Sequence, residues 1–286
     1  MQRVPRYDTA SLVKKLLVYG KILLFGICSE RRRTSREEKD AVSYAQDNIE
    51  TFLKNELKSR GDTFRFDCKM CGKCCRKRRE PILINGADAF RMARALGESV
   101  QRVVVENTIH YLGEKSHVPL IVLKERMDGS CRMLRKGKCM VQQDKPAVCA
   151  LYPLGRYQDL RDGSVHYFLN PGTCAGYDAD REWTLQEWLD KFTLEENGQM
   201  TLAWNGLFSG ICSVTCKMAE EDISEEMRAA MAFVLYIHYD TERSFVEQVE
   251  ENKTLIQAVF RDRFHVTELR QKAHGFNRGM NGEKEK

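Results

Sequence analysis

A chain of 286 residues with 42% hydrophobic and 30% charged residues has the composition of an ordinary folded protein, not of a disordered one. Its 46 basic and 41 acidic residues leave a formal net charge of +5, which is too small at this length to argue for nucleic acid or anionic lipid as a partner. The eleven cysteines are odd in number and gather in one region. They therefore favour reduced thiolates on metal in the cytoplasm over a disulfide framework.

Residues 12–28 are apolar but interrupted by Lys14, Lys15 and Lys21. Their longest clean run is about seven residues, whereas a transmembrane helix needs about twenty, and no clean signal-peptide pattern is present. The lysines and leucines fall on opposite sides of a helical wheel. We therefore expect an amphipathic helix packed on the protein, with a helix lying on a membrane surface as the alternative. The expected location is cytoplasmic, with peripheral contact with the inner membrane as the alternative.

Residues 29–62 are predicted to begin as a charged linker and become a helix, because Val42, Ile49, Leu53 and Leu57 recur at helical spacing before Gly61. Further along the chain, a helix is predicted in "INGADAFRMARALG" and strands in "HVPLIVLKER" and "SVHYFLN". Helices follow in "TLQEWLDKF", "SEEMRAAMAFVLYIHYD" and "SFVEQVEENKTLIQAVFRDRF".

These elements predict an α+β fold that is mostly helical, with a short-stranded, cysteine-rich metal-binding core flanked by N- and C-terminal helices. Residues 1–62 would hold the amphipathic helix, the linker and a helix, and residues 63–190 the cysteine cluster domain. Residues 191–274 would form a C-terminal helical region, and residues 275–286 a disordered tail.

The stretch "CKMCGKCC" carries two successive Cys-x-x-Cys steps at Cys68, Cys71 and Cys74, followed directly by Cys75. A Cys-x-x-Cys turn points two sulfurs at one metal, and Gly72 stands where such a turn needs a residue without a Cβ. Adjacent side chains usually diverge, so we expect Cys74 and Cys75 to bridge two sites, one sulfur to each. That arrangement predicts further ligands downstream.

Four more cysteines follow, three in "DGSCRMLRKGKCMVQQDKPAVCALYPL" and one in "NPGTCAGYD". Eight thiolates are enough for two four-thiolate sites, or for one such site and a cluster. The candidate metal ligands are Cys68, Cys71, Cys74, Cys75, Cys131, Cys139, Cys149 and Cys174.

The spacing slightly favours an iron–sulfur cluster over zinc. A zinc ribbon would repeat Cys-x-x-Cys in its second half, but here the later gaps are seven and nine residues. The first three cysteines match the spacing of a bacterial ferredoxin, although Cys75 comes too early for its fourth ligand and lacks the following proline. Zinc stays the alternative.

Basic residues are interleaved with both groups of cysteines. We expect them to offset thiolate charge rather than to form a nucleic-acid patch. They are Lys69, Lys73, Arg76, Lys77, Arg78, Arg79, Arg132, Arg135, Lys136 and Lys138.

On these motifs, residues 64–188 resemble the YkgJ-type cysteine cluster family, a zinc- or iron-chelating domain with a Cys-x2-Cys-x2-Cys-Cys motif. The family's usual Arg-Pro is Lys145-Pro146 here, and Ala150 stands where arginine is common. The final cysteine, Cys174, is followed by Gly176 and later by the family's "TLQEW". The resemblance implies all eight cysteines as metal ligands but no settled activity. Flagellin lysine N-methylases carry a related domain, yet no glycine-rich loop for S-adenosylmethionine stands in this chain.

Other candidate residues have simpler interpretations. Cys28 and the pair Cys212 and Cys216 are expected to be structural, since buried cysteines are common. Asp128 and Asp144 have two possible roles, either beside the metal ligands or in forming turns, and the sequence does not distinguish them. The histidines of the cysteine section are expected on the surface or in turns; they are His110, His117 and His166. The tryptophans are expected to anchor the core; they are Trp183, Trp188 and Trp204.

Three functions remain open at this point. The first is an iron–sulfur protein that transfers electrons, within an oxidoreductase or to a redox partner. The second is a zinc-stabilised module that binds another protein. The third is a lysine methylase-like enzyme. No specific nucleic-acid partner is expected, and contact with a membrane would run through residues 12–28.

Overall fold

The computed structural model describes residues 55–76, 81–158, 164–170 and 174–262. The fold is α+β and mostly helical, as predicted. Within these ranges, no helix is both long enough and apolar enough to cross a bilayer. The predicted N-terminal helix, most of the helix predicted before Gly61 and the C-terminal tail lie outside the described residues.

The strands pair into small antiparallel sheets, with the orders β1-β9-β8, β10-β2, β3-β5-β4 and β6-β7. In chain order the strands are β1 (Glu56–Leu57), β2 (Thr63–Arg65), β3 (Leu83–Ile84), β4 (Thr108–Leu112), β5 (Pro119–Leu123), β6 (Leu134–Arg135), β7 (Lys138–Cys139), β8 (Leu154–Gln158), β9 (Val165–Leu169) and β10 (Glu182–Thr184).

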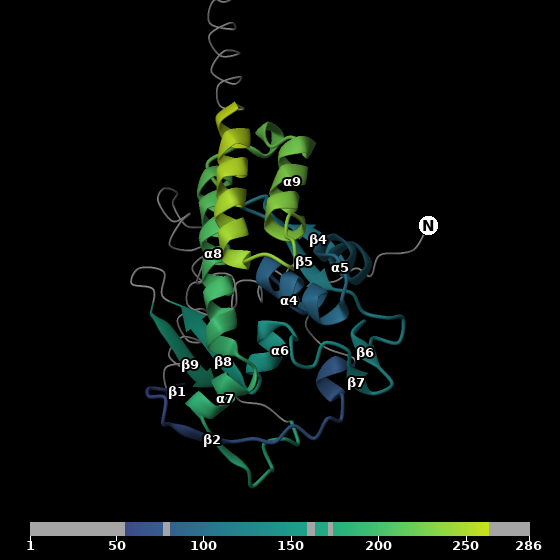
Figure 1. The fold of residues 1–286 in the computed structure, drawn as a ribbon, viewed down its shortest axis with the longest axis vertical. Helices are drawn as coiled ribbons and strands as arrows, with labels where there is room; N and C mark the ends of the chain where they lie inside the picture. Colours follow the sequence, from purple (N-terminus) through teal and green to yellow (C-terminus); the bar gives the residue numbers. More distant parts are fainter. Residues whose placement is uncertain (1–54, 77–80, 159–163, 171–173, 263–286) are drawn as a thin grey trace, which may run out of the picture.

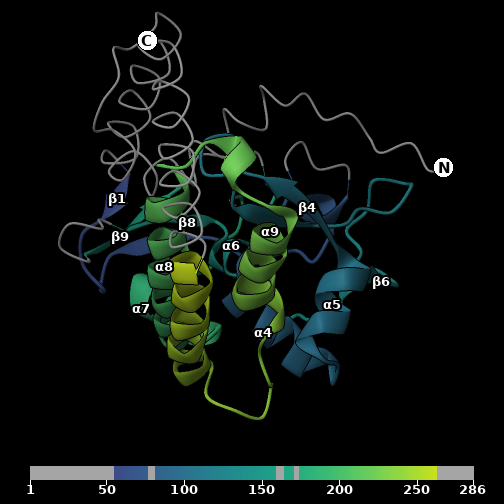
Figure 2. The same cartoon turned by 90° about the horizontal axis from the view of Figure 1, so that it is seen from above.

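Most of the helical residues lie in the upper half of the view, above strands β1, β2, β8 and β9 (Figure 1). The helices are η1 (Lys73–Cys75), α4 (Gly86–Leu96), α5 (Val100–Asn107), α6 (Ala147–Leu151), α7 (Leu185–Lys191), α8 (Leu194–Thr215), η2 (Glu220–Asp222), α9 (Glu225–Ala232) and the π-helical turn η3 (Phe233–Ile237). Residues 245–262 form a last helix beside α8, as both views show (Figures 1 and 2).

Local capping explains where the two best-predicted helices begin and end. Asn85 accepts a hydrogen bond from the backbone of Asp88, whose side chain accepts in return from Asn85, and Gly97 ends α4 at φ 64°. Thr184 and Glu187 form the same reciprocal box at the start of α7. Both helices therefore agree with their predicted positions.

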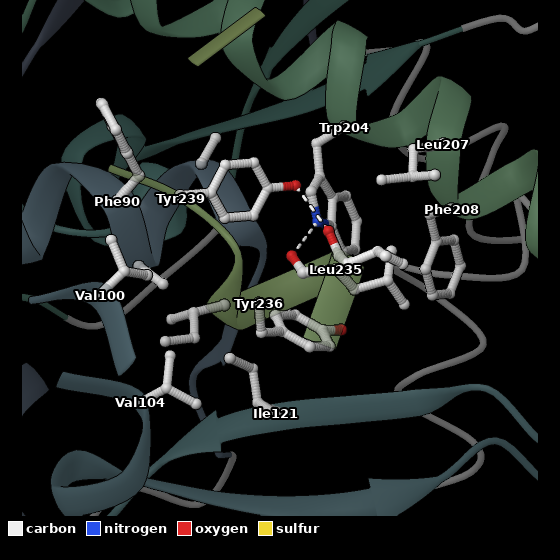
Figure 3. Packing of buried hydrophobic residues seen from close by; sticks show 14 of the residues in the cluster. Phe90, Val100, Val104, Ile121, Trp204, Leu207, Phe208, Leu235, Tyr236 and Tyr239 are labelled. Carbon is white, nitrogen blue, oxygen red and sulfur yellow. Dashed lines mark hydrogen bonds between the residues drawn. The ribbon is translucent and has the colours of Figure 1, made fainter. Parts of the chain in front are cut away.

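The larger hydrophobic core lies between α4, α5, α8, α9, the C-terminal helix and the sheet β3-β5-β4 (Figure 1). Figure 3 shows Trp204 of α8 at its centre, where the indole N–H donates to the carbonyl of Leu235 at 2.8 Å. Tyr236 is also buried and donates its hydroxyl to the carbonyl of Pro119 at 3.0 Å. These bonds let polar groups stay inside an apolar core without an unpaired donor.

A second, smaller core packs α6, α7, β2, β8 and β9 around aromatic rings. Trp188 is 2% exposed and meets Phe64 and Phe66 edge to face, at ring distances of 5.6 and 5.7 Å. Its indole donates to the carbonyl of Leu151, which fixes α7 against α6. The expectation that Trp188 and Trp204 anchor cores is confirmed, each in a different core.

Two features differ from the predictions. Leu57, expected near the end of a helix, lies in strand β1 opposite Tyr167, because that edge of β9 offers it a backbone partner. Residues 191–274 were predicted to be helical, but no separate helix was predicted at the position of α8, the longest described helix. Its buried residues include Asn197, Gly198 and Thr215, which are polar or small, so the apolar stripe of the helix is interrupted in the sequence.

Candidate metal centre

The first cysteine run ends in a tight turn that brings two sulfurs together. Gly72 takes φ 69°, and the backbone N–H of Cys75 bonds to its carbonyl at 3.0 Å, which closes the 3-10 turn η1. As a result the sulfurs of Cys74 and Cys75 lie 3.8 Å apart. The prediction that these two side chains diverge is therefore wrong, because a 3-10 turn rotates neighbouring side chains less far apart than an extended strand does.

The hydrogen bond between Cys74 and Cys75 shifts the pKa values of the two thiols in opposite directions. The bond from Cys74 lowers the pKa of Cys75, against the opposing effect of burial. The same bond, followed by burial, holds the pKa of Cys74 far above its usual range. Cys75 is therefore the member of the pair that becomes a thiolate first, which is the form that binds metal.

Three downstream cysteines gather around Cys75. The backbone N–H of Cys131 donates to the carbonyl of Cys75 at 2.7 Å, and Cys139 pairs with Leu134 across the β6-β7 hairpin. Cys149 lies in the first turn of α6. The charges of Cys131, Cys149 and Cys139 all act to raise the pKa of Cys75, so each of these thiols lies within electrostatic range of Cys75. Burial also raises the pKa of Cys139.

A buried ion pair positions the segment that precedes Cys149. Asp88 accepts from Arg91 at 2.7 Å and from the backbone of Ala147 at 2.8 Å, and the side chains of the pair are 4% and 1% exposed. Arg91 also donates to the carbonyl of Lys145 at 3.3 Å. This pair was not predicted. Its signal in the sequence was the presence of two charged residues on the otherwise apolar face of α4.

Cys174 lies on the other side of the centre, beside the second core. Its sulfur accepts from the backbone N–H of Gly176 at 3.4 Å, and the carbonyl of Gly176 accepts from Asp67 at 2.9 Å. The segment that carries Cys174 is therefore bonded to the residue before Cys68. Cys71 is exposed, and its carbonyl accepts from Arg76 at 3.1 Å.

Two lysines outside the predicted basic groups lie near the thiols. The charge of Lys145 lowers the pKa of both Cys74 and Cys139, and its ammonium lies 4.3 Å from the ring centre of Phe192. Burial, and then repulsion by Arg181, lower the pKa of Lys191, while Asp67 and Cys68 act in the opposite direction. Charge compensation therefore has support at Lys145 and Lys191, whereas Lys69 pairs with Asp67 at 3.5 Å.

The thiols lie near one another but do not yet form a complete set of metal ligands. Among the residues that the structure describes, no group of three or more His, Cys, Asp or Glu side chains is placed to hold an ion. The donor set nevertheless fits zinc or iron, since all eight predicted ligands are free cysteines and Cys74 and Cys75 already converge. The assignment of eight ligands remains a prediction.

The remaining candidates mostly follow their simpler interpretations. Cys212 is free and fully buried, while Cys216 is disulfide-bonded and so departs from the expectation of reduced thiols. His166 bonds Glu56 at 2.7 Å. Asp128 accepts from the backbone of Ser130 at 2.9 Å, which makes it a turn residue. Cys28 lies outside the described residues.

Comparison with known proteins agrees with the geometry. Residues 67–180 match the CxxCxxCC family, described as "Putative zinc- or iron-chelating domain". No curated protein and no solved structure matches the chain. The matched range includes all eight candidate cysteines, the η1 turn and the β6-β7 hairpin. Residues 67–180 are therefore similar to the CxxCxxCC family of zinc- or iron-chelating domains.

Proposed function

We propose that this chain is a metal protein in which cysteine thiolates hold zinc or iron between its two hydrophobic cores. Cys131 belongs to the larger core, and Cys75 and Cys139 pack against it. Cys174 packs against the smaller, aromatic core. A metal held by thiolates from both groups would link the cores, which supports a structural role for the centre.

The distance between Cys74 and Cys75 carries the proposal. At a zinc–sulfur bond length of about 2.3 Å, two thiolates of a tetrahedral site lie about 3.8 Å apart, and these two sulfurs are separated by 3.8 Å. Each iron of a four-cysteine [2Fe–2S] cluster also carries two thiolates, whereas each iron of a [4Fe–4S] cluster carries one. The geometry thus favours one zinc ion, or one iron of a [2Fe–2S] cluster, on both adjacent sulfurs.

The chain's own residues prepare the thiolates for binding. Cys75 loses its proton first, because its hydrogen bond with Cys74 lowers its pKa. Lys145 offsets negative charge near Cys74 and Cys139, and Lys191 does so near Cys68. A bound metal would supply a cross-link between the segments, together with redox chemistry if it were iron.

Electron transfer by an iron–sulfur cluster is the second candidate. The exposure of Cys68, Cys71 and Cys74 favours it, because these thiols would place the edge of a cluster at the surface, within reach of a redox partner. The methylase resemblance has no comparable support from the geometry and remains a prediction.

Metal analysis of protein purified without oxygen tests the proposal. We expect about one to two zinc equivalents per chain, or about two to four iron equivalents if the centres are [2Fe–2S] clusters, since eight thiolates can serve up to two four-thiolate centres. Cys75→Ser should lower this content by at least about half, because it removes one of the two converging sulfurs and a ligand that a four-coordinate site requires. Cys212→Ala, which removes a thiol outside the cluster, should leave the content unchanged. A metal-free parent protein with all eight thiols reactive would contradict metal binding.

Visible absorption then separates the two roles. A cluster would give acid-labile sulfide and a broad band near roughly 400 nm that bleaches on reduction. A colourless zinc protein would eliminate the electron-transfer candidate and leave the structural one.

A further inference from the structure

A pocket of about 440 Å³ is lined by residues of α5 and of the β6-β7 hairpin. These two elements lie close together in both views (Figures 1 and 2). Four arginines and two glutamates are among the residues that line the pocket. Its volume falls within the range of small-molecule sites. We propose that this pocket binds the phosphate group of a small organic molecule.

The two glutamates do not neutralise the pocket. Glu98 and Glu106 both pair with Arg102, at 2.8 and 3.0 Å, as i,i+4 neighbours along the helix. Arg126, Arg132 and Arg135 form no ion pair with any carboxylate of the described chain, so the lining keeps a net formal charge of +2. An anion entering the pocket therefore meets three guanidinium groups whose charge is uncompensated.

Arg126 is held in place before any ligand arrives. Its Nη1 donates to the carbonyl of Cys131 at 3.0 Å, and its Nη2 donates to the carbonyl of Arg132 at 2.8 Å. These bonds fix the plane of the guanidinium, which lowers the entropy lost when it binds an anion. Arg132 is tethered through its Nε, which donates to Asn107 at 3.3 Å, and both of its terminal nitrogens stay available.

The end of α5 would otherwise repel an anion at this position, because its last carbonyls carry partial negative charge. Lys124 donates to two of them, the carbonyls of Val105 and Glu106, at 2.9 and 3.0 Å. The lysine therefore shields the pocket from the negative end of the helix.

Part of the wall is apolar, which favours an organic phosphate over the free ion. Leu96 and Val103 line the helical side, and Met133 and Met140 line the hairpin side. Met140 is 37% exposed, and its backbone bonds to Met133 at 2.9 Å. Met133 is buried, so Met140 is the methionine that a base or another apolar body can pack against, and its side chain adapts to flat or irregular ligands.

Calorimetric titration of the full-length, metal-loaded chain tests the proposal, with 5′-AMP, inorganic pyrophosphate and adenosine as probes. We expect 5′-AMP and pyrophosphate to bind at one site per chain, and adenosine, which lacks the phosphate, to bind at least about tenfold more weakly than 5′-AMP. If neither phosphate probe binds, or if adenosine binds as tightly as 5′-AMP, the proposal is wrong.

A double variant and a matched control locate the site. Arg132→Gln with Arg135→Gln should weaken 5′-AMP at least about tenfold, because it removes two uncompensated guanidiniums. Lys136→Gln with Lys138→Gln removes the same charge from the same hairpin but no pocket-lining residue, and should change affinity less than about twofold. Equal weakening by both double variants would show attraction by surface charge alone, and no weakening by the first would show that 5′-AMP binds elsewhere; either result would overturn the site.

Chemical modification of the unaltered chain gives the same answer without mutation. Pyrophosphate should protect Arg132 and Arg135 from phenylglyoxal, as read by mass spectrometry, while Arg94 outside the pocket should react at an unchanged rate. Equal rates at all three arginines with and without pyrophosphate would overturn the proposal.

Discussion

At the scale of single residues, the carboxylate of Asp88 joins three parts of the structure near the candidate centre. It accepts from the side chain of Arg91 and from the backbone N–H groups of Asn85 and Ala147. One residue thus caps α4, pairs a buried arginine and holds the start of α6. Its burial makes each of these bonds costly to lose.

Asp88→Ala should lower the free energy of unfolding by about 3–5 kcal/mol, because it leaves the guanidinium of Arg91 buried without its counter-ion. Urea denaturation measures this change. Glu250→Ala is the control: Glu250 pairs with Lys253 at the same i,i+3 spacing but on the surface. It should cost less than about 1 kcal/mol. Equal effects of the two substitutions would contradict the assigned role of Asp88.

The buried thiol of Cys212 makes the stability of the protein depend on pH in the alkaline range. Burial raises the pKa of this thiol from 9.0 to about 12. Below pH 9 the thiol is protonated in both states and has no effect on stability. As pH rises from 9 toward about 12, the unfolded chain loses this proton more readily than the folded one, so stability falls.

Cys212→Ala should therefore show a shallower loss of unfolding free energy across this pH range than the parent protein. Denaturant unfolding at several pH values between about 8 and about 11 measures the two slopes. Tyr236 and Tyr239, whose pKa values burial also raises, remain in both proteins and give the shared background. Parallel curves would show that Cys212 does not contribute.

At the scale of elements, the contact of α4 with α8 and η3 depends on a residue without a side chain. A Cβ on Gly86 would come within 2.5 Å of the indole nitrogen of Trp204 and still closer to the carbonyl of Leu235. These two groups are themselves joined by the hydrogen bond shown in Figure 3. The first turn of α4 therefore packs directly on that bond.

Gly86→Ala should destabilise the protein by about 1–3 kcal/mol, because the added methyl group must displace backbone or the Trp204 ring. Gly210→Ala in α8 is the matched control, since a Cβ there meets no atom within 4 Å. It should instead stabilise by about 0.5–1 kcal/mol, as alanine does in place of an interior helical glycine. Thermal unfolding followed by circular dichroism distinguishes the two; a neutral Gly86→Ala would contradict the packing.

At the scale of the whole molecule, the first cysteine run has little besides a metal to hold it. The η1 turn buries none of its residues, and Cys68, Cys71 and Cys74 are exposed. The helices around the larger core bury an extensive apolar surface of their own. Order in the cysteine run should therefore depend on metal, and order in the core should not.

Removal of the metal with a chelator should accelerate amide hydrogen exchange in residues 67–76 and leave α4 and α8 protected. Exchange followed by mass spectrometry measures both in one experiment. Cys75→Ser should show the fast exchange before any chelator is added. Exchange in residues 67–76 that does not change on metal removal would contradict the proposed link between the cores.

The sequence by itself determined the features that depend on a few neighbouring residues. The bounds of α4 and α7 follow from their caps, β5 and β9 follow from short apolar runs, and the cysteine motif follows from its spacing. The two helix starts are predictable because their capping bonds join residues three positions apart, and the strands because a short apolar run marks each of them in the sequence.

Only the tertiary structure decided how the distant segments meet. It brought Cys131 to the carbonyl of Cys75, placed Lys145 and Lys191 near the thiols, and paired Leu57 with Tyr167. Contacts of this kind join residues more than fifty positions apart, as in the bond between Asp88 and Ala147. No local pattern encodes such contacts, because their free energy comes from burial that exists only after the cores have packed.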